Sequence, residues 1–148
     1  MEKIIEIDTR NKKDSYLTNY LDEHNIKWIR NKLYAGDVKL LNSTEVIIDL
    51  KASTEEIVHN LCNNEEHRRI RGELEKAQII GCKKFIFLIK DDNITCIDDL
   101  KNWSSERTKV KGQTLIKIML TMKDRYGCRF IYTTKENMGK EVLKLLKY

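Results

Sequence analysis

The stretch GDVKLLNSTEVIIDLK, residues 36–51, decides the fold because it reads as two strands joined by a tight turn. GDVKLL (36–41) and EVIIDLK (45–51) are rich in the β-branched and apolar residues typical of strands. Asn42 and Ser43 supply turn chemistry between them, so we expect a β-hairpin. The second strand nevertheless ends in charged residues, which buried strands normally avoid.

Three charged side chains are expected to gather at one end of this hairpin. Successive strand residues point to opposite faces, so Asp49 and Lys51 share a face. Asp37 opens the preceding strand, and Gly36 before it leaves room for a bulge or for close approach of a ligand. Two carboxylates and an ammonium group can therefore converge on one point of the sheet.

This cluster suggests a metal site, because a divalent cation relieves the repulsion between two carboxylates. Oxygen ligands without nearby sulfur or imidazole favour Mg²⁺, with Mn²⁺ able to substitute. We expect Asp37 and Asp49 to hold the metal, and Lys51 to orient or deprotonate a water or to stabilise developing charge. Asp8, at the end of KIIEID (3–8), is a further candidate ligand and catalytic acid. The alternative is a surface hairpin with an ion pair and an Asp8 that faces solvent.

The rest of the chain alternates between helical and strand patterns. Further strands are expected at residues 3–8, 26–33, 84–89 and 128–133. Helices are expected at 12–24, after a cap at Ser53 or Thr54, at 65–80, in a short form near 98–103, at 112–127 and at 137–147. This order predicts an α/β sandwich with a mixed sheet. No linker divides the sequence, so we expect one domain over residues 1–148.

Composition limits the functional classes. No apolar run approaches the roughly 20 residues that a bilayer span requires, and the charged N-terminus does not resemble a signal peptide, so a cytoplasmic protein with no membrane partner is expected. The four cysteines form no CxxC pair, which favours reduced thiols over a zinc site or disulfides. Residues 101–148 carry 12 basic and four acidic side chains. A basic segment of this kind suits a polyanion such as nucleic acid, although a solvated lysine surface has the same composition.

The order of these motifs resembles the nuclease domain of the XPF-type structure-selective endonucleases. That family typically shows V-D-x-R-E at a strand end, a helix, G-D-Y, and then E-R-K. Here Asp8 and Arg10 lie on the first motif, Gly36 and Asp37 on the second, and the D-L-K of residues 49–51 on the third. The segment HRRIRGELEKAQIIGCKKFIFLI and the chain from residue 112 onward are also similar to compact single-domain members from phages and bacteria.

The resemblance implies a restriction-endonuclease-like, three-layer α/β/α fold and a PD-(D/E)xK site. It further implies a Mg²⁺-dependent endodeoxyribonuclease that acts on branched, flap or fork DNA in repair or recombination. A homodimer is consistent with it, because two cuts need two sites and relatives dimerise. Arg10 and Glu73 would support the metal-binding acids, although each has a plain ion pair as its alternative. For Glu73 the alternative partners are Arg69 and Lys76.

Basic residues are candidates for binding DNA phosphates. Arg68, Arg69 and Arg71 cluster one turn before Glu73, and Lys111 lies in a basic segment nearer the C-terminus. A solvated helix face is the alternative for the arginine cluster.

Three departures from the family pattern keep rival functions open. Asn11 stands where the family has glutamate, Asp49 replaces the usual glutamate of the third motif, and Leu50 replaces its arginine. The alternatives are a Holliday-junction resolvase of the same fold and a DNA-binding partner subunit whose catalytic site has decayed.

Overall fold

A six-stranded mixed sheet forms the centre of the computed structural model, which describes residues 2–11 and 14–148. The strand order is β2-β1-β3-β4-β5-β6. Their bounds are β1 Ile5–Asp8, β2 Trp28–Asn31, β3 Val38–Leu40, β4 Val46–Lys51, β5 Lys84–Lys90 and β6 Arg129–Thr133. Strand β3 is antiparallel to β1 and β4, whereas the pairs β1–β2, β4–β5 and β5–β6 are parallel. The predicted hairpin and the mixed sheet are therefore confirmed.

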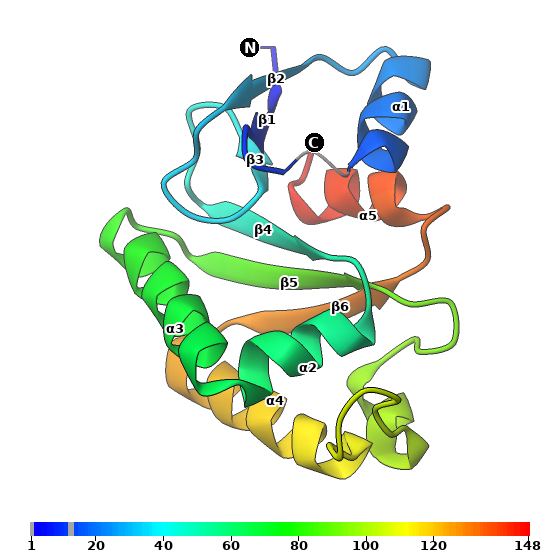
Figure 1. The fold of residues 1–148 in the computed structure, drawn as a ribbon. Helices are drawn as coiled ribbons and strands as arrows, with labels where there is room; N and C mark the ends of the chain where they lie inside the picture. The colour runs from blue at the N-terminus through cyan, green and yellow to red at the C-terminus, as the bar shows by residue number, and fades with distance from the viewer. Residues whose placement is uncertain (1, 12–13) are drawn as a thin grey trace.

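Helices cover both faces of this sheet, as Figure 1 shows. Helices α1 (Ser15–Glu23) and α5 (Met138–Leu145) lie on one face. The other face carries α2 (Thr54–Cys62), α3 (Asn64–Ile79) and α4 (Gly112–Tyr126), with the short 3₁₀ helix η1 (Ile97–Asn102) beside α4. The predicted three-layer α/β/α architecture is confirmed. The first helix was expected from residue 12, but residues 12–13 lie outside the described part of the chain.

Strand β4 divides its side chains between the two helical layers. Ile47 packs with the α2, α3 and α4 side, whereas Ile48 and Leu50 pack with the α1 and α5 side. This division follows from the two-residue period of a strand. It places Asp49 and Lys51 on the face that α2, α3 and α4 cover.

Local signals fix the start of the helices nearest to β4. Ser53 caps α2, because its hydroxyl oxygen accepts a hydrogen bond from the Glu56 amide at 3.1 Å. Asn63 caps α3 in the same way through the Glu66 amide. Helix α2 therefore starts directly after the strand that carries Asp49, and α3 follows it after a single residue, Asn63.

The first edge strand is shorter than its sequence pattern indicates. Residues 26–33 were expected to be extended, but β2 spans only Trp28–Asn31 and is largely exposed. It pairs only with β1, so no second strand holds its ends in place. None of the helices in residues 2–11 and 14–148 combines the length and apolar character that crossing a bilayer demands.

Candidate active site

Charged side chains from β1, the turn just before β3, β4, α2 and α3 line one cleft of about 290 Å³ at the edge of the sheet where β4 ends. Eight charged residues contribute to its wall: Asp8, Arg10, Asp37, Asp49, Lys51, Glu56, Arg69 and Glu73. All the predicted catalytic residues are among them. The cleft therefore contains the three charged residues, Asp37, Asp49 and Lys51, that the hairpin of residues 36–51 is expected to bring together.

Asp37 and Asp49 lie beside each other on neighbouring strands. Val38 pairs with Ile48, and extending that antiparallel register by one residue sets Asp37 opposite Asp49. The Asp37 amide donates to the Ile48 carbonyl at 2.8 Å, and one Asp37 carboxylate oxygen accepts from the Leu50 amide at 2.8 Å. The two carboxyl groups are close enough that the charge of Asp49 raises the pKa of the Asp37 carboxyl. The hairpin therefore brings both acids to one point.

The negative charge of this pair is only partly compensated. Burial raises the pKa of the Asp37 carboxyl well above its ordinary value, and repulsion from Asp49 adds to the shift. The hydrogen bond from the Leu50 amide and the charge of Lys51 act in the opposite direction, but do not cancel it. A cation between the two carboxylates would remove the repulsion that raises this pKa.

Lys51 completes the group from the same face of β4. Its ammonium nitrogen lies 3.2 Å from Oδ1 of Asp49, and both side chains are about nine-tenths buried. The ammonium also lies 6.0 Å from the ring centroid of Phe87 on β5, which limits where it can move. A lysine held here can reach an anionic group that enters the cleft beside Asp49.

Gly36 and Glu73 position Asp37. Gly36 has a φ of +74°, and a Cβ atom there would approach Cγ2 of Ile47 to 2.3 Å. Its amide donates to Oε1 of Glu73 at 2.8 Å. The Glu73 carboxylate on α3 therefore supports the turn that delivers Asp37. Among the described residues, no ion pair joins Glu73 to Arg69 or Lys76, the alternative partners predicted for it. Arg69 pairs with Glu66 at 2.8 Å instead.

Asp8 has a different set of partners from the other two acids. Its carboxylate accepts from Nε of Arg10 at 2.8 Å and from the Leu33 amide at 2.9 Å. Arg10 also donates to the Leu33 carbonyl at 3.0 Å, so the pair ties the segment before Gly36 to the end of β1. The hydrogen bond and charge of Asp8 raise the pKa of Arg10 in turn. Asp8 lies in the cleft wall but is engaged in holding the backbone.

The donor set suits a hard cation bound by two carboxylates. In residues 2–11 and 14–148, no three acidic, histidine or cysteine side chains form a group that could hold a metal ion. The predicted trio of Asp8, Asp37 and Asp49 is therefore not assembled, because Asp8 is committed to Arg10 and Leu33. Mg²⁺ commonly binds through one or two carboxylates and keeps several waters, so Asp37 and Asp49 alone fit it.

The sequence matches the family model described as the ERCC4 domain over residues 7–146, which is nearly the whole chain. The chain belongs to the ERCC4 domain family. Among curated proteins, none matches it. The predicted resemblance to XPF-type nuclease domains is confirmed by this match.

Solved structures show the same fold for this ERCC4 domain. XPF from Aeropyrum pernix superposes with a TM-score of 0.71 at 15% identity, covering 97% of this chain. XPF from Aeropyrum pernix in complex with DNA gives a TM-score of 0.72 at 16% identity and covers 99% of this chain. The chain spans 63% and 64% of those two proteins. At these identities the likeness establishes the fold.

Leu50 and Asn11, two of the departures from the family pattern, lie in different surroundings. Leu50 packs in the core beneath α1 and α5, and only its backbone amide serves the cleft through Asp37. Its substitution for arginine therefore leaves the carboxylate side of β4 unchanged. Asn11, in contrast, lines the cleft itself. Its amide donates to the Asp8 carbonyl at 3.2 Å, and its carbonyl accepts from Arg30 at 2.8 Å.

The four residues predicted to bind DNA are not brought together. Arg69 lines the cleft, whereas Arg71 lines a separate pocket against α4. Arg68 is exposed and lines neither. Lys111 precedes α4 in a bridge with Ser104 and also lies outside the cleft. Arg69 and Arg71, two residues apart on α3, point about 200° apart, so these two arginines cannot act as one patch.

Glu56 lines the cleft with Asp49, although no sequence pattern predicts it as a site residue. The available signal is its place in the first turn of α2, which starts three residues after β4 ends. A helix that starts so soon after a strand directs its first turn toward the end of that strand.

Proposed function

We propose that this ERCC4 domain is a metal-dependent DNA endonuclease that hydrolyses phosphodiester bonds in branched DNA such as flaps and forks. The observation that carries the proposal is the convergence of Asp37, Asp49 and Lys51 on one cleft. The family and the fold support it, because the matching solved structures are of XPF, one of them in complex with DNA.

Mg²⁺ is the proposed cofactor, with Asp37 and Asp49 as its protein ligands. When bound, such an ion lowers the pKa of a water ligand and neutralises charge on the phosphate that is attacked. The support is that the charge of the buried acid pair is only partly compensated by Lys51 and the Leu50 amide. Mn²⁺ should substitute, because it takes the same oxygen ligands.

Other residues of the cleft have separate roles in the proposed reaction. Lys51 holds the scissile phosphate or the attacking water beside Asp49, within a wall that limits the access of bulk water. Glu73 and Gly36 keep Asp37 opposite Asp49. Arg69, which is exposed at the cleft, is the residue placed to contact a neighbouring phosphate.

One observation supports a second candidate function. Asn11 occupies the cleft position where the family pattern has an acid, so the domain could bind DNA without cutting it and act as a partner subunit. The retained Asp37, Asp49 and Lys51 favour the enzyme.

A cleavage assay on flap, fork, Holliday-junction and duplex DNA with Mg²⁺, Mn²⁺ or Ca²⁺ tests the proposal. The wild-type protein should cut flap or fork DNA with Mg²⁺ or Mn²⁺. Asp49→Asn and Lys51→Ala should each lower the rate at least about a hundredfold, the range for removal of one preorganised catalytic group. The controls Asp98→Asn and Lys101→Ala remove the same charges from exposed positions and should leave the rate unchanged.

The outcomes separate the candidates. DNA binding without cutting in any metal would establish the partner subunit and refute the enzyme. Cutting confined to the four-way junction would identify a resolvase of the same fold. Equal rates for wild type and Asp49→Asn would show that another site performs the reaction.

A further inference from the structure

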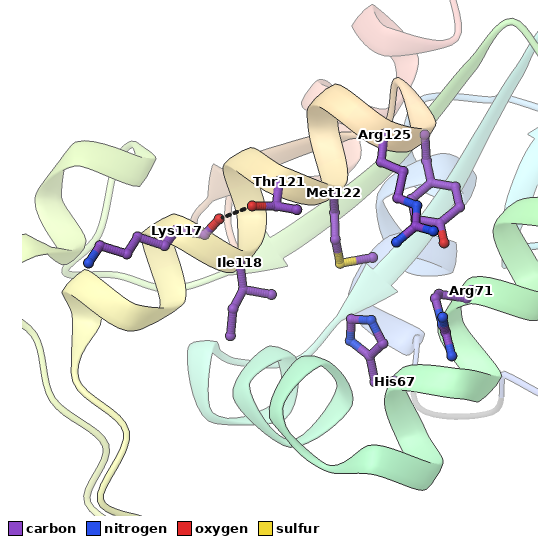
Figure 2. Close-up of a pocket in the computed structure, with 8 residues that line it drawn as sticks. His67, Arg71, Lys117, Ile118, Thr121, Met122 and Arg125 are labelled. Carbon is purple, nitrogen blue, oxygen red and sulfur yellow. Dashed lines mark hydrogen bonds between the residues drawn. The ribbon is translucent and has the colours of Figure 1, made fainter.

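A second pocket, of about 280 Å³, lies between α3 and α4 and takes no part in the site described above. Figure 2 shows His67 and Arg71 on α3 facing Met122 and Arg125 on α4. Ile118, Met122 and Tyr126 make one side of it apolar. A cavity with an apolar wall and a few polar groups is the usual form of a small-ligand site.

The other side of this pocket carries positive charge that is not neutralised. Of the ion pairs found in residues 2–11 and 14–148, none involves Arg71, Lys117 or Arg125. The pocket wall contains no acidic side chain. Nε of Arg71 is fully buried and has no hydrogen-bond partner. An anionic ligand here would therefore meet cations whose charge no carboxylate of the described residues neutralises.

His67 leaves one ring nitrogen for a ligand. Its Nδ1 lies 2.9 Å from the Leu61 carbonyl, which can only accept, so Nδ1 carries a proton. Nε2 is then the ring nitrogen that remains. The guanidinium of Arg125 lies 5.8 Å from the ring centroid of Tyr126, which sets a cation next to an aromatic face.

Helix α3 separates this pocket from the catalytic cleft. Arg69 and Glu73 face the cleft, while His67 and Arg71 face α4. A helix with its side chains is about 10–12 Å across. A DNA strand that rises about 3.4 Å per nucleotide covers that distance in roughly three nucleotides. One continuous strand can therefore reach both sites.

We propose that the α3–α4 pocket binds an unpaired nucleotide of a single DNA strand, an assignment that rests on the DNA endonuclease function proposed above. The phosphate lies against Arg71 and Arg125, and the base lies on the apolar wall formed with Tyr126. A base inside a duplex is stacked and paired and cannot enter, so the pocket selects DNA that carries a single-stranded arm.

The test measures binding of a fluorescein-labelled oligothymidylate and of a blunt duplex by anisotropy in EDTA, so that no cleavage occurs. Thr121→Glu places an acid in the pocket at an exposed position of α4, and Thr114→Glu makes the same change on α4 outside the pocket. Arg125→Gln is matched in the same way by Lys123→Gln. All four positions are exposed, so the variants are expected to fold.

We expect Thr121→Glu and Arg125→Gln to weaken oligothymidylate binding about tenfold, the effect of one charge-assisted hydrogen bond. Their matched controls should stay within about twofold. Arg125→Gln should also reduce the slope of log affinity against log salt by about 0.7, because one phosphate contact is lost. Duplex binding should change little in either variant.

Three results would overturn the proposal. Equal oligothymidylate affinities for Thr121→Glu and Thr114→Glu would show that the pocket takes no part. Equal losses for single strand and duplex would mean a general phosphate contact. Binding of labelled polyglutamate that Thr121→Glu abolishes, with oligothymidylate affinity unchanged, would assign the pocket to an acidic peptide. None of these readouts uses cleavage, so they fail or succeed independently of the active-site variants.

Discussion

Replacing Gly36 by alanine should both destabilise the protein and disturb the active site. The residue precedes Asp37 and has a φ of +74°, a conformation that residues with a Cβ rarely adopt. A Cβ atom would also meet Cγ2 of Ile47 at 2.3 Å and the Ile48 carbonyl oxygen at 3.2 Å. Both contacts are with β4, the strand that carries Asp49.

The two penalties can be estimated separately. A left-handed conformation costs an alanine about 1–2 kcal/mol. Overpacking in a filled core costs about 1–3 kcal/mol, because Ile47 is fully buried and has nowhere to move. Gly36→Ala should therefore lower the free energy of unfolding by about 2–5 kcal/mol, a large part of the roughly 5–15 kcal/mol of a typical domain.

Gly81→Ala and Gly127→Ala are matched controls for this estimate. Their φ values are +84° and +69°, and a Cβ atom at either position meets nothing within 4 Å. Each should cost only the backbone penalty of about 1–2 kcal/mol. Urea denaturation followed by circular dichroism measures all three variants against wild type. A Gly36→Ala variant no less stable than Gly81→Ala would refute the argument that contact with β4 requires glycine here.

Other predictions concern the metal, the acidic support of the turn and the thiols. Mg²⁺ at about a hundred times its dissociation constant should stabilise the wild type by roughly 2.7 kcal/mol, measured by thermal unfolding. The same concentration should change the stability of Asp49→Asn little. Equal shifts in both proteins would show that the ion binds elsewhere. Glu73→Ala should cost about 1.5–3 kcal/mol in urea, because the Gly36 amide loses a charged acceptor, while Glu73→Gln should recover part of that loss through its amide oxygen. Burial raises the pKa of the Cys128 thiol to about 11, so at pH 8 it is almost entirely protonated and should resist a thiol reagent, whereas exposed Cys96 should react at once. A fast phase that survives in the triple variant Cys62→Ser, Cys82→Ser and Cys96→Ser would contradict the protection of Cys128.

The hairpin could be predicted from the sequence because its information is local. The alternation of β4 sets Asp49 and Lys51 on one face, and the short turn sets the register that brings Asp37 opposite Asp49. These relations depend on the period of a strand and the length of a turn, both of which can be read directly. The three-layer arrangement followed from the order of the elements and the family resemblance.

The parts that escaped prediction depend on contacts between distant segments. That Asp8 also accepts from the Leu33 amide is set by the path of the loop between β2 and β3, which has no periodic pattern. The separation of Arg69 from Arg71 depends on how α3 is rotated against the sheet. The rotation of α3 cannot be predicted from the number of basic residues in its sequence.

Leu50 points away from the side chains of its neighbours Asp49 and Lys51, so β4 serves the core on one face and the cleft on the other. The side chains of residues 47, 49 and 51 face the layer with the cleft, and those of residues 46, 48 and 50 face the other layer. Substitutions at the even positions therefore act mainly on packing under α1 and α5, whereas substitutions at Asp49 and Lys51 act on the cleft of the proposed reaction. Six consecutive residues thus present two sets of side chains that can be varied for different purposes.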